Sequence, residues 1–155
     1  MTTVCLLGKP EYDLRTELLS RQTARRALST YQLRQPYENT IAIQTISLGA
    51  AVAFCNDLNW YLVRFTDDVL IREPSITDTE WLSKPLAIAI RENETDPDTI
   101  GPHLKVFGVE PLQEGPPKLV EPMYATMIDG SVPEYDLRPV ERTETVYVTQ
   151  SEWGD

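Results

Sequence analysis

The sequence predicts an α+β fold, in which a small mixed sheet with about three helices precedes an extended, acidic, proline-rich C-terminal tail. Strand-like apolar segments alternate with segments of helical spacing in the order β-α-β-α-β-β-α-β. Charge and proline are divided unevenly, because residues 92–155 hold four Lys/Arg against fourteen Asp/Glu and eight of the twelve prolines lie after residue 96. We therefore expect a globular domain over residues 1–110 and an acidic tail over 111–155, which docks on the domain or on a partner.

The first half of the expected domain contains two strands and two helices. Asp13 and Ser47 stand where helices would begin, and both residue types cap free backbone N–H groups. Leu14, Leu18 and Leu28 follow helical spacing behind Asp13. These patterns predict a strand over 3–7, a helix over 13–31, a strand over 40–46 and a helix over 48–59.

The second half is expected to begin with a hairpin and to end with a strand. Residues 60–65 and 69–71 have strand composition, with a polar three-residue turn between them. Thr77 and Glu80 form a capping box that predicts a third helix, and Pro85 kinks or restarts that helix. For the apolar segment after Pro85 a strand is the alternative to a helix. The final predicted strands are 104–109 in the domain and 145–149 in the tail.

Composition limits the class of protein. No apolar run approaches the length of a membrane span, so we expect a soluble cytoplasmic protein with no membrane contact. Cys5 and Cys55 lie in apolar segments and are expected to be buried free thiols. His103 is the only histidine, and therefore the sequence predicts neither a metal site nor a cofactor.

The basic residues comprise ten Arg and only four Lys beside twenty-four Asp and Glu, a composition that suits high salt. The segments ELLSRQTARRALSTYQLRQPYENTIAIQTISLGAAV, NDLNWYLVRF and REPSITDTEWLSKPLA resemble a family of small uncharacterised proteins of halophilic archaea, classified as a domain of unknown function. The resemblance covers about residues 1–110. It implies a cytoplasmic location and an origin in high salt, and it implies no activity and no functional residues.

A cluster of arginines is the candidate interaction face. Guanidinium groups bind carboxylates and phosphates through two parallel hydrogen bonds, so this face could bind a protein partner or the acidic tail. The alternative is a solvated helix face paired with nearby glutamates. Nucleic acid is a less favoured partner, because a net charge of -10 repels phosphate. The face consists of Arg15, Arg21, Arg25, Arg26 and Arg34.

These observations favour a non-enzymatic protein-interaction or regulatory module, and they predict no catalytic residues. One alternative is a factor that contacts RNA or a ribonucleoprotein through the arginine face. A second alternative is a small enzyme that uses His103, the one side chain that titrates near neutral pH without perturbation. The aromatic residues Trp60, Tyr61 and Phe65 are flanked by carboxylates, and we expect them to pack in the core. The sequence does not predict an oligomeric state.

Overall fold

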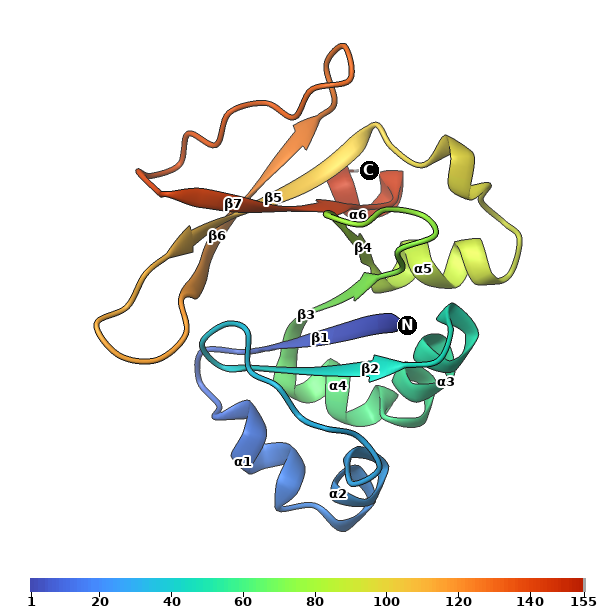
Figure 1. Ribbon diagram of the computed structural model, residues 1–155, viewed down its shortest axis with the longest axis vertical. Helices are drawn as coiled ribbons and strands as arrows, with labels where there is room; N and C mark the ends of the chain where they lie inside the picture. The colour runs from blue at the N-terminus through green and yellow to red at the C-terminus, as the bar shows by residue number, and fades with distance from the viewer. Residues whose placement is uncertain (155) are drawn as a thin grey trace.

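A computed structural model describes residues 1–154, and this part of the chain folds around one seven-stranded mixed sheet (Figure 1). The strand order across the sheet is β2-β1-β3-β4-β7-β5-β6. The strands are β1 (Thr2–Gly8), β2 (Thr40–Thr45), β3 (Thr66–Arg72), β4 (Trp81–Ser83), β5 (His103–Glu110), β6 (Lys118–Thr126) and β7 (Arg142–Tyr147).

Six α-helices and one short 3-10 helix complete the described chain. The α+β class is confirmed, whereas the expectation of a small sheet with about three helices is wrong for residues 1–154. The helices are α1 (Leu14–Leu19), α2 (Gln22–Leu28), α3 (Leu48–Asp57), α4 (Asn59–Phe65), α5 (Lys84–Arg91), η1 (Pro97–Thr99) and α6 (Gln150–Gly154). None of the helices in residues 1–154 has the length and apolar character that crossing a bilayer requires.

The chain beyond residue 110 contributes two strands to the sheet. β6 pairs antiparallel with β5 at one edge. β7 lies between β4 and β5, parallel to β4 and antiparallel to β5. Residues on both sides of the expected boundary at 110 therefore share one sheet. The prolines after residue 110 argue against strands in this part of the sequence. Pro122 nevertheless lies within β6, because β6 is an edge strand, where a missing backbone N–H is tolerated.

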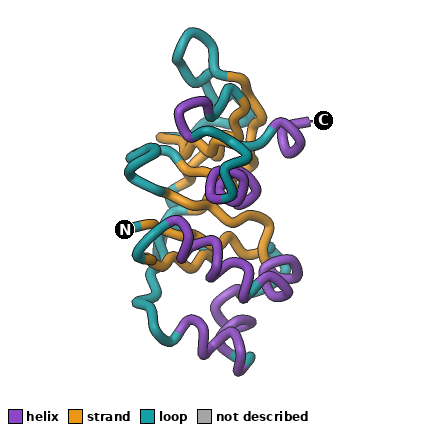
Figure 2. Tube along the Cα trace, turned by 90° about the vertical axis from the view of Figure 1, so that its right-hand side faces the viewer, coloured by secondary structure: helices purple, strands orange, loops and turns teal. Residues whose placement is uncertain are grey.

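One face of the sheet is covered by helices. Side chains alternate along β1, so Val4 and Leu6 point to the face opposite Cys5 and Leu7. Val4 and Leu6 pack in a core with buried residues of α1 to α5. Figures 1 and 2 show that α1 to α4 gather around the end of the sheet that holds β1, β2 and β3, whereas β5, β6 and β7 lie in the other half.

The opposite face is concave. β3 and β5 are three positions apart in the strand order, which in a flat sheet separates them by about 14 Å. Nevertheless the Lys105 Nζ on β5 lies 2.7 Å from the Asp68 Oδ2 on β3. The sheet must therefore curl toward this face, where Leu7, Phe107 and Val146 belong to one buried cluster.

The Glu144 carboxylate ties β7 to three other segments on the concave face. The Tyr37 hydroxyl donates to Glu144 Oε1 at 2.5 Å, and the Trp81 Nε1 donates to Glu144 Oε2 at 3.2 Å. The Arg72 guanidinium lies 3.6 Å from Glu144 Oε2 and stacks on the Trp81 ring, with its Cζ 3.9 Å from the ring centroid. Burial, reinforced by the bond to Glu144, raises the pKa of Tyr37 above its ordinary value.

The expected strand over residues 60–65 is wrong, because this segment is α4. Leu58, Leu62 and Phe65 follow helical spacing and are all buried, which a two-residue alternation would not allow. The Thr66 hydroxyl donates to the Leu62 carbonyl where α4 ends and β3 begins. The expected hairpin at residues 66–68 is therefore absent from the described chain.

Two helix predictions also need correction. The single helix expected over 13–31 is two short helices, since Arg21 adopts an extended backbone between α1 and α2. The Thr77 and Glu80 side chains do hydrogen-bond, but they precede β4 and begin no helix. The helix nearest to the expected third one is α5, which begins after Ser83; the Ser83 side chain accepts from the Leu86 N–H, and Pro85 fits in the first turn. The helix expected for the segment after Pro85 is confirmed, and the alternative of a strand is not.

Gly108 allows the chain after β6 to pack closely on β5, and it supplies a test of this fold. A Cβ at Gly108 would lie 2.7 Å from Val140 Cγ1 and 3.0 Å from Tyr135 Cε1. We expect Gly108→Ala to lower the free energy of unfolding by about 1–3 kcal/mol, because neither neighbour can move aside without disturbing its packing. Urea unfolding would measure this loss, and Val140→Ala in the same chain should restore part of it. A Gly108→Ala variant as stable as the wild type would contradict the packing.

Candidate functional site

An arginine-aromatic cluster surrounds the Phe65 ring where α1 meets α4. The Tyr12 ring meets Phe65 edge to face, with centroids 4.9 Å apart. Arg21 Cζ lies 4.9 Å and Arg64 Cζ 5.8 Å from the Phe65 centroid. Cations over an aromatic face are stabilised by the ring quadrupole. We call this set the Arg–aromatic cluster, and it consists of Tyr12, Arg21, Trp60, Tyr61, Arg64 and Phe65.

The outer part of this cluster is open to solvent. Trp60 is 58% exposed and its neighbour Val63 is 67% exposed. Arg64 Cζ lies 5.4 Å from the Trp60 centroid, one helical turn further along α4. Arg21 Nη2 lies 3.2 Å from Glu17 Oε2, while the buried Arg21 Nε has no hydrogen-bond partner in residues 1–154. Exposed tryptophan and arginine side chains that lie together are enriched at surfaces that bind another molecule.

The five arginines expected from the sequence are dispersed by the break between α1 and α2. Arg21 belongs to the Arg–aromatic cluster. The other four are exposed, and none of them forms an ion pair within residues 1–154; they are Arg15, Arg25, Arg26 and Arg34. The backbone of Arg34 pairs with Ala42, beside the β2 edge.

Sequence reasoning missed Arg64 and Trp60 because it placed them on a strand. On a helix, residues four apart lie on one face, so the spacing of Trp60 and Arg64 was the available signal. The sequence predicts that the acidic segment after residue 110 docks on these five arginines. In the described chain no ion pair joins that segment to any of them. Within residues 1–154 that segment instead docks through Glu144 and through Glu152, which accepts from the Ser83 hydroxyl.

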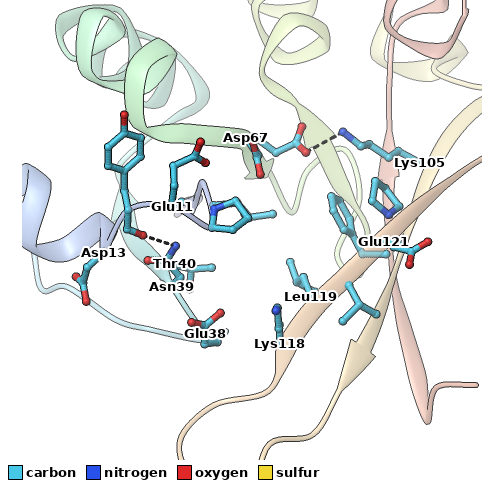
Figure 3. A pocket seen from close by; sticks show the side chains of 18 of the residues that line it. Glu11, Asp13, Glu38, Asn39, Thr40, Asp67, Lys105, Lys118, Leu119 and Glu121 are labelled. Atoms are coloured by element: carbon cyan, nitrogen blue, oxygen red, sulfur yellow. Dashed lines mark hydrogen bonds and ion pairs between the residues drawn. The ribbon is translucent and has the colours of Figure 1, made fainter. Parts of the chain in front are cut away.

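A cleft of about 850 Å³ opens on the concave face (Figure 3). Leu7 and Phe107 are buried side chains of its floor, and Leu119 is partly buried beside them. Glu11 and Asp67 point toward the same part of the cleft in Figure 3. The other charged residues that line it are Asp13, Glu38, Asp68, Lys105, Lys118, Glu121 and Arg138.

The Asp68–Lys105 ion pair lies in the wall of this cleft. The side chains are 22% and 13% exposed, respectively. Burial raises the pKa of Asp68 above its usual value and outweighs the opposing effect of Lys105, and neighbouring Asp67 adds to the rise. The pKa of Lys105 is also raised, since burial, which lowers it, is outweighed by Asp68 and Tyr124.

Asn39 organises the opposite wall. Its backbone is in the left-handed region, with φ of 57°, where asparagine is well tolerated. Its amide Nδ2 donates to the carbonyls of Lys9 and Tyr12, and its Oδ1 accepts from the Leu14 N–H. This one side chain therefore fixes the loop between β1 and α1, which carries Glu11.

The possible nucleophiles lie in unreactive surroundings. Cys5 and Cys55 are buried free thiols, as expected. Burial raises the pKa of Cys5 to about 12 and that of Cys55 to about 11, so the reactive thiolate is scarce at neutral pH. His103 is half-buried, its ring lies 5.0 Å from that of Trp153, and its Nδ1 has no hydrogen-bond partner in the described chain. Residues 1–154 contain no group of three or more His, Cys, Asp or Glu side chains that could hold a metal ion.

The fold and these sites define a mixed α+β protein with a curled sheet, an exposed Arg–aromatic cluster and a charged cleft. The model of a family of unknown function, DUF5804, matches residues 2–109, and the chain belongs to this family. The match ends in β5, so it includes the Arg–aromatic cluster but excludes β6 and β7. No curated protein and no solved structure matches the chain.

Proposed function

We propose that this protein is a non-enzymatic protein-interaction module that binds an acidic protein partner through the Arg–aromatic cluster. The observation that carries the proposal is the exposed Trp60 beside Arg64, next to the Phe65 ring over which Arg21 lies. Tryptophan and arginine dominate the binding energy of protein interfaces, because a rigid aromatic body and a guanidinium fork lose little conformational freedom on binding.

Charge favours an acidic partner. Arg15, Arg25 and Arg26 are exposed on the helices next to the cluster. Residues 1–40 hold six Lys/Arg against four Asp/Glu in a chain whose net charge is -10, so this face is locally basic on an acidic protein. Such a face attracts a complementary negative surface.

RNA is the second candidate for the same face, since arginine and tryptophan also bind phosphates and stack on bases. The net charge disfavours it over long range. An enzyme that uses His103 receives less support, because the His103 ring packs against Trp153 and the thiols are buried.

We test the interaction proposal by affinity capture from the native cell extract, with nuclease-treated and untreated samples. The variant Trp60→Ala/Arg64→Ser should lose an acidic protein that the wild type retains, because the exposed anchor and one guanidinium are removed. The matched control Ile46→Ala/Arg138→Ser changes an exposed apolar residue and an exposed arginine, both outside the cluster. It should retain the partner.

Two outcomes would contradict this proposal. Equal recovery by both variants would show that the cluster is not the binding surface. Loss of all captured material after nuclease treatment would favour the RNA alternative.

We further propose a cytoplasmic protein adapted to high salt, in line with the resemblance to proteins of halophilic archaea. The supporting observation is the acid-rich, lysine-poor composition, with fourteen Asp and Glu after residue 91. Carboxylates at this density repel one another, and dissolved salt screens the repulsion over about 3 Å at 1 M compared with about 10 Å at 0.1 M.

The salt proposal predicts a thermal unfolding midpoint that rises from low to multimolar KCl. Screening should stabilise the folded state, because folding brings the many carboxylates after residue 91 closer together than they are in the unfolded chain. Circular dichroism at a series of KCl concentrations would measure the midpoint. A midpoint that does not change with salt would remove the support for adaptation to high salt.

A further inference from the structure

We infer that the outer edge of β6 pairs with the same edge of a second copy of the chain, which gives a two-fold symmetric dimer. β6 is an edge strand, at the opposite end of the sheet from β2 (Figure 1). An edge strand carries N–H and C=O groups that no strand of its own sheet can use, and these groups can pair with another chain. This edge is separate from the Arg–aromatic cluster, which is built around Phe65 of α4.

The hydrogen bonds around β5 and β6 define which backbone groups face outward. The Met127 N–H donates to the Pro102 carbonyl, just beyond the ladder that joins the two strands. Because alternate residues of an antiparallel strand face the same neighbour, Tyr124 and Thr126 face away from β5. The carbonyl of His103, opposite Thr126, agrees with this direction, since it accepts from the residue that follows β7, on the other side of β5. The backbone groups of Tyr124 and Thr126 therefore line the outer edge, without a partner within residues 1–154.

Other positions on the sheet edges are protected. On β2, the backbones of Arg34 and Ala42 exchange two hydrogen bonds. On β6, Pro122 has no N–H, and the Glu121 carbonyl accepts from the Tyr135 hydroxyl at 2.6 Å. Proline, charged side chains and covering segments are the usual protection of an edge. The end of β6 after Pro122 is the exception, because it contains neither proline nor a charged residue.

The backbone of a second copy complements this edge. With a two-fold axis at Ala125, the outward groups of Tyr124 lie opposite those of Thr126 of the second copy, and each N–H meets a carbonyl. Pro122 then lies opposite Ile128 of the second copy. Pro122 has no N–H, and Ile128 already exchanges its backbone bonds within the turn that follows β6. Each strand therefore runs out of free donors at the same place as the other.

The side chains favour the same pairing. Tyr124 is 47% exposed and Ile128 is 62% exposed, and residues 123–128 carry no charge. The partly buried Met123 lies opposite Met127 of the second copy in this pairing, and methionine side chains adapt to fill such contacts. Two chains of net charge -10 repel each other, so a segment without carboxylates lets them meet without placing like charges face to face.

The inferred pairing closes at two chains. Both copies use the same edge, so that edge is no longer open to a third chain. The other edge of the sheet is bridged by Arg34 at Ala42 of β2. We therefore expect a dimer whose sheet is continuous across the two-fold axis, and no longer assembly.

Analytical ultracentrifugation of the full chain in about 1 M KCl, where charge repulsion is screened, tests this inference. We expect a monomer–dimer equilibrium in the wild type. Thr126→Pro removes an N–H that faces away from β5, so it leaves the bonds between β5 and β6 in place. It removes one bond from each copy across the dimer axis, and we expect the dimer Kd to rise about tenfold or more. The control Thr126→Val keeps this N–H and should dimerise like the wild type.

Several results would overturn the inference. One is a wild-type chain that stays monomeric up to about 1 mM, a concentration at which even a weak contact is occupied. Equal dimerisation of Thr126→Pro and Thr126→Val would place the contact elsewhere, and assembly beyond two chains would contradict the closed pairing.

Hydrogen exchange of the wild type supplies a measurement that does not depend on any variant. The amides of Tyr124 and Thr126 should exchange slowly at high chain concentration and faster after dilution. The amide of Met127, which bonds to Pro102 within one chain, should not respond to dilution. Fast exchange of Tyr124 and Thr126 at every concentration would reject the pairing. Protection of these amides only in the presence of cell extract would show that a different protein pairs with the edge.

Discussion

The Glu144 carboxylate is the interaction on which the arrangement of the sheet depends. It lies on β7, the strand inserted between β4 and β5, and its side chain is only 12% exposed. Tyr37, Trp81 and Arg72 converge on it from the segment before β2, from β4 and from β3. A buried carboxylate is costly without such partners, so the network holds β7 in one register against the first half of the sheet. β4 is only three residues long, so few backbone hydrogen bonds join it to β7.

Both candidate sites follow from this arrangement. Because the sheet curls around the junction, β5 and β6 approach β1 and β3 and enclose the cleft, and Lys105 reaches Asp68. The helices occupy the other face, where α4 packs against α1 and presents Trp60 and Arg64 outward. The family match covers the helical half and ends before β6 and β7. The Arg–aromatic cluster is thus built from matched residues, whereas the cleft needs Lys118 and Glu121 from outside the match.

Local signals predicted the elements that depend on local chemistry. The caps at Asp13 and Ser47 mark helix starts, and the apolar runs of β1, β2 and β5 mark strands, because each signal lies within a few residues of its effect. The segment 60–65 was misassigned since short apolar runs suit both a helix and a strand. Its burial pattern is decided by α1 and β3, which the local sequence does not contain.

The sequence patterns do not indicate which strands pair when they lie far apart in the chain. The composition of residues 145–149 predicts a strand, but nothing in it indicates insertion between β4 and β5. Of the five arginines expected to form an interaction face, Arg21 lies in the Arg–aromatic cluster and the other four lie outside it. The cleft could not be predicted, because residues from five strands and three loops meet there only after the sheet curls. A pattern read along one segment carries no information about that curvature.

Urea unfolding of Glu144→Gln, compared with Glu141→Gln, tests the central claim most directly. Both changes remove one negative charge from the start of β7 or next to it, but Glu141 is exposed and has no ion pair in residues 1–154. We predict that Glu144→Gln lowers the free energy of unfolding by about 1–3 kcal/mol, because Arg72 and Tyr37 lose their charged partner. Glu141→Gln should stay within about 0.5 kcal/mol of the wild type. Equal stability of the two variants would contradict the role assigned to Glu144.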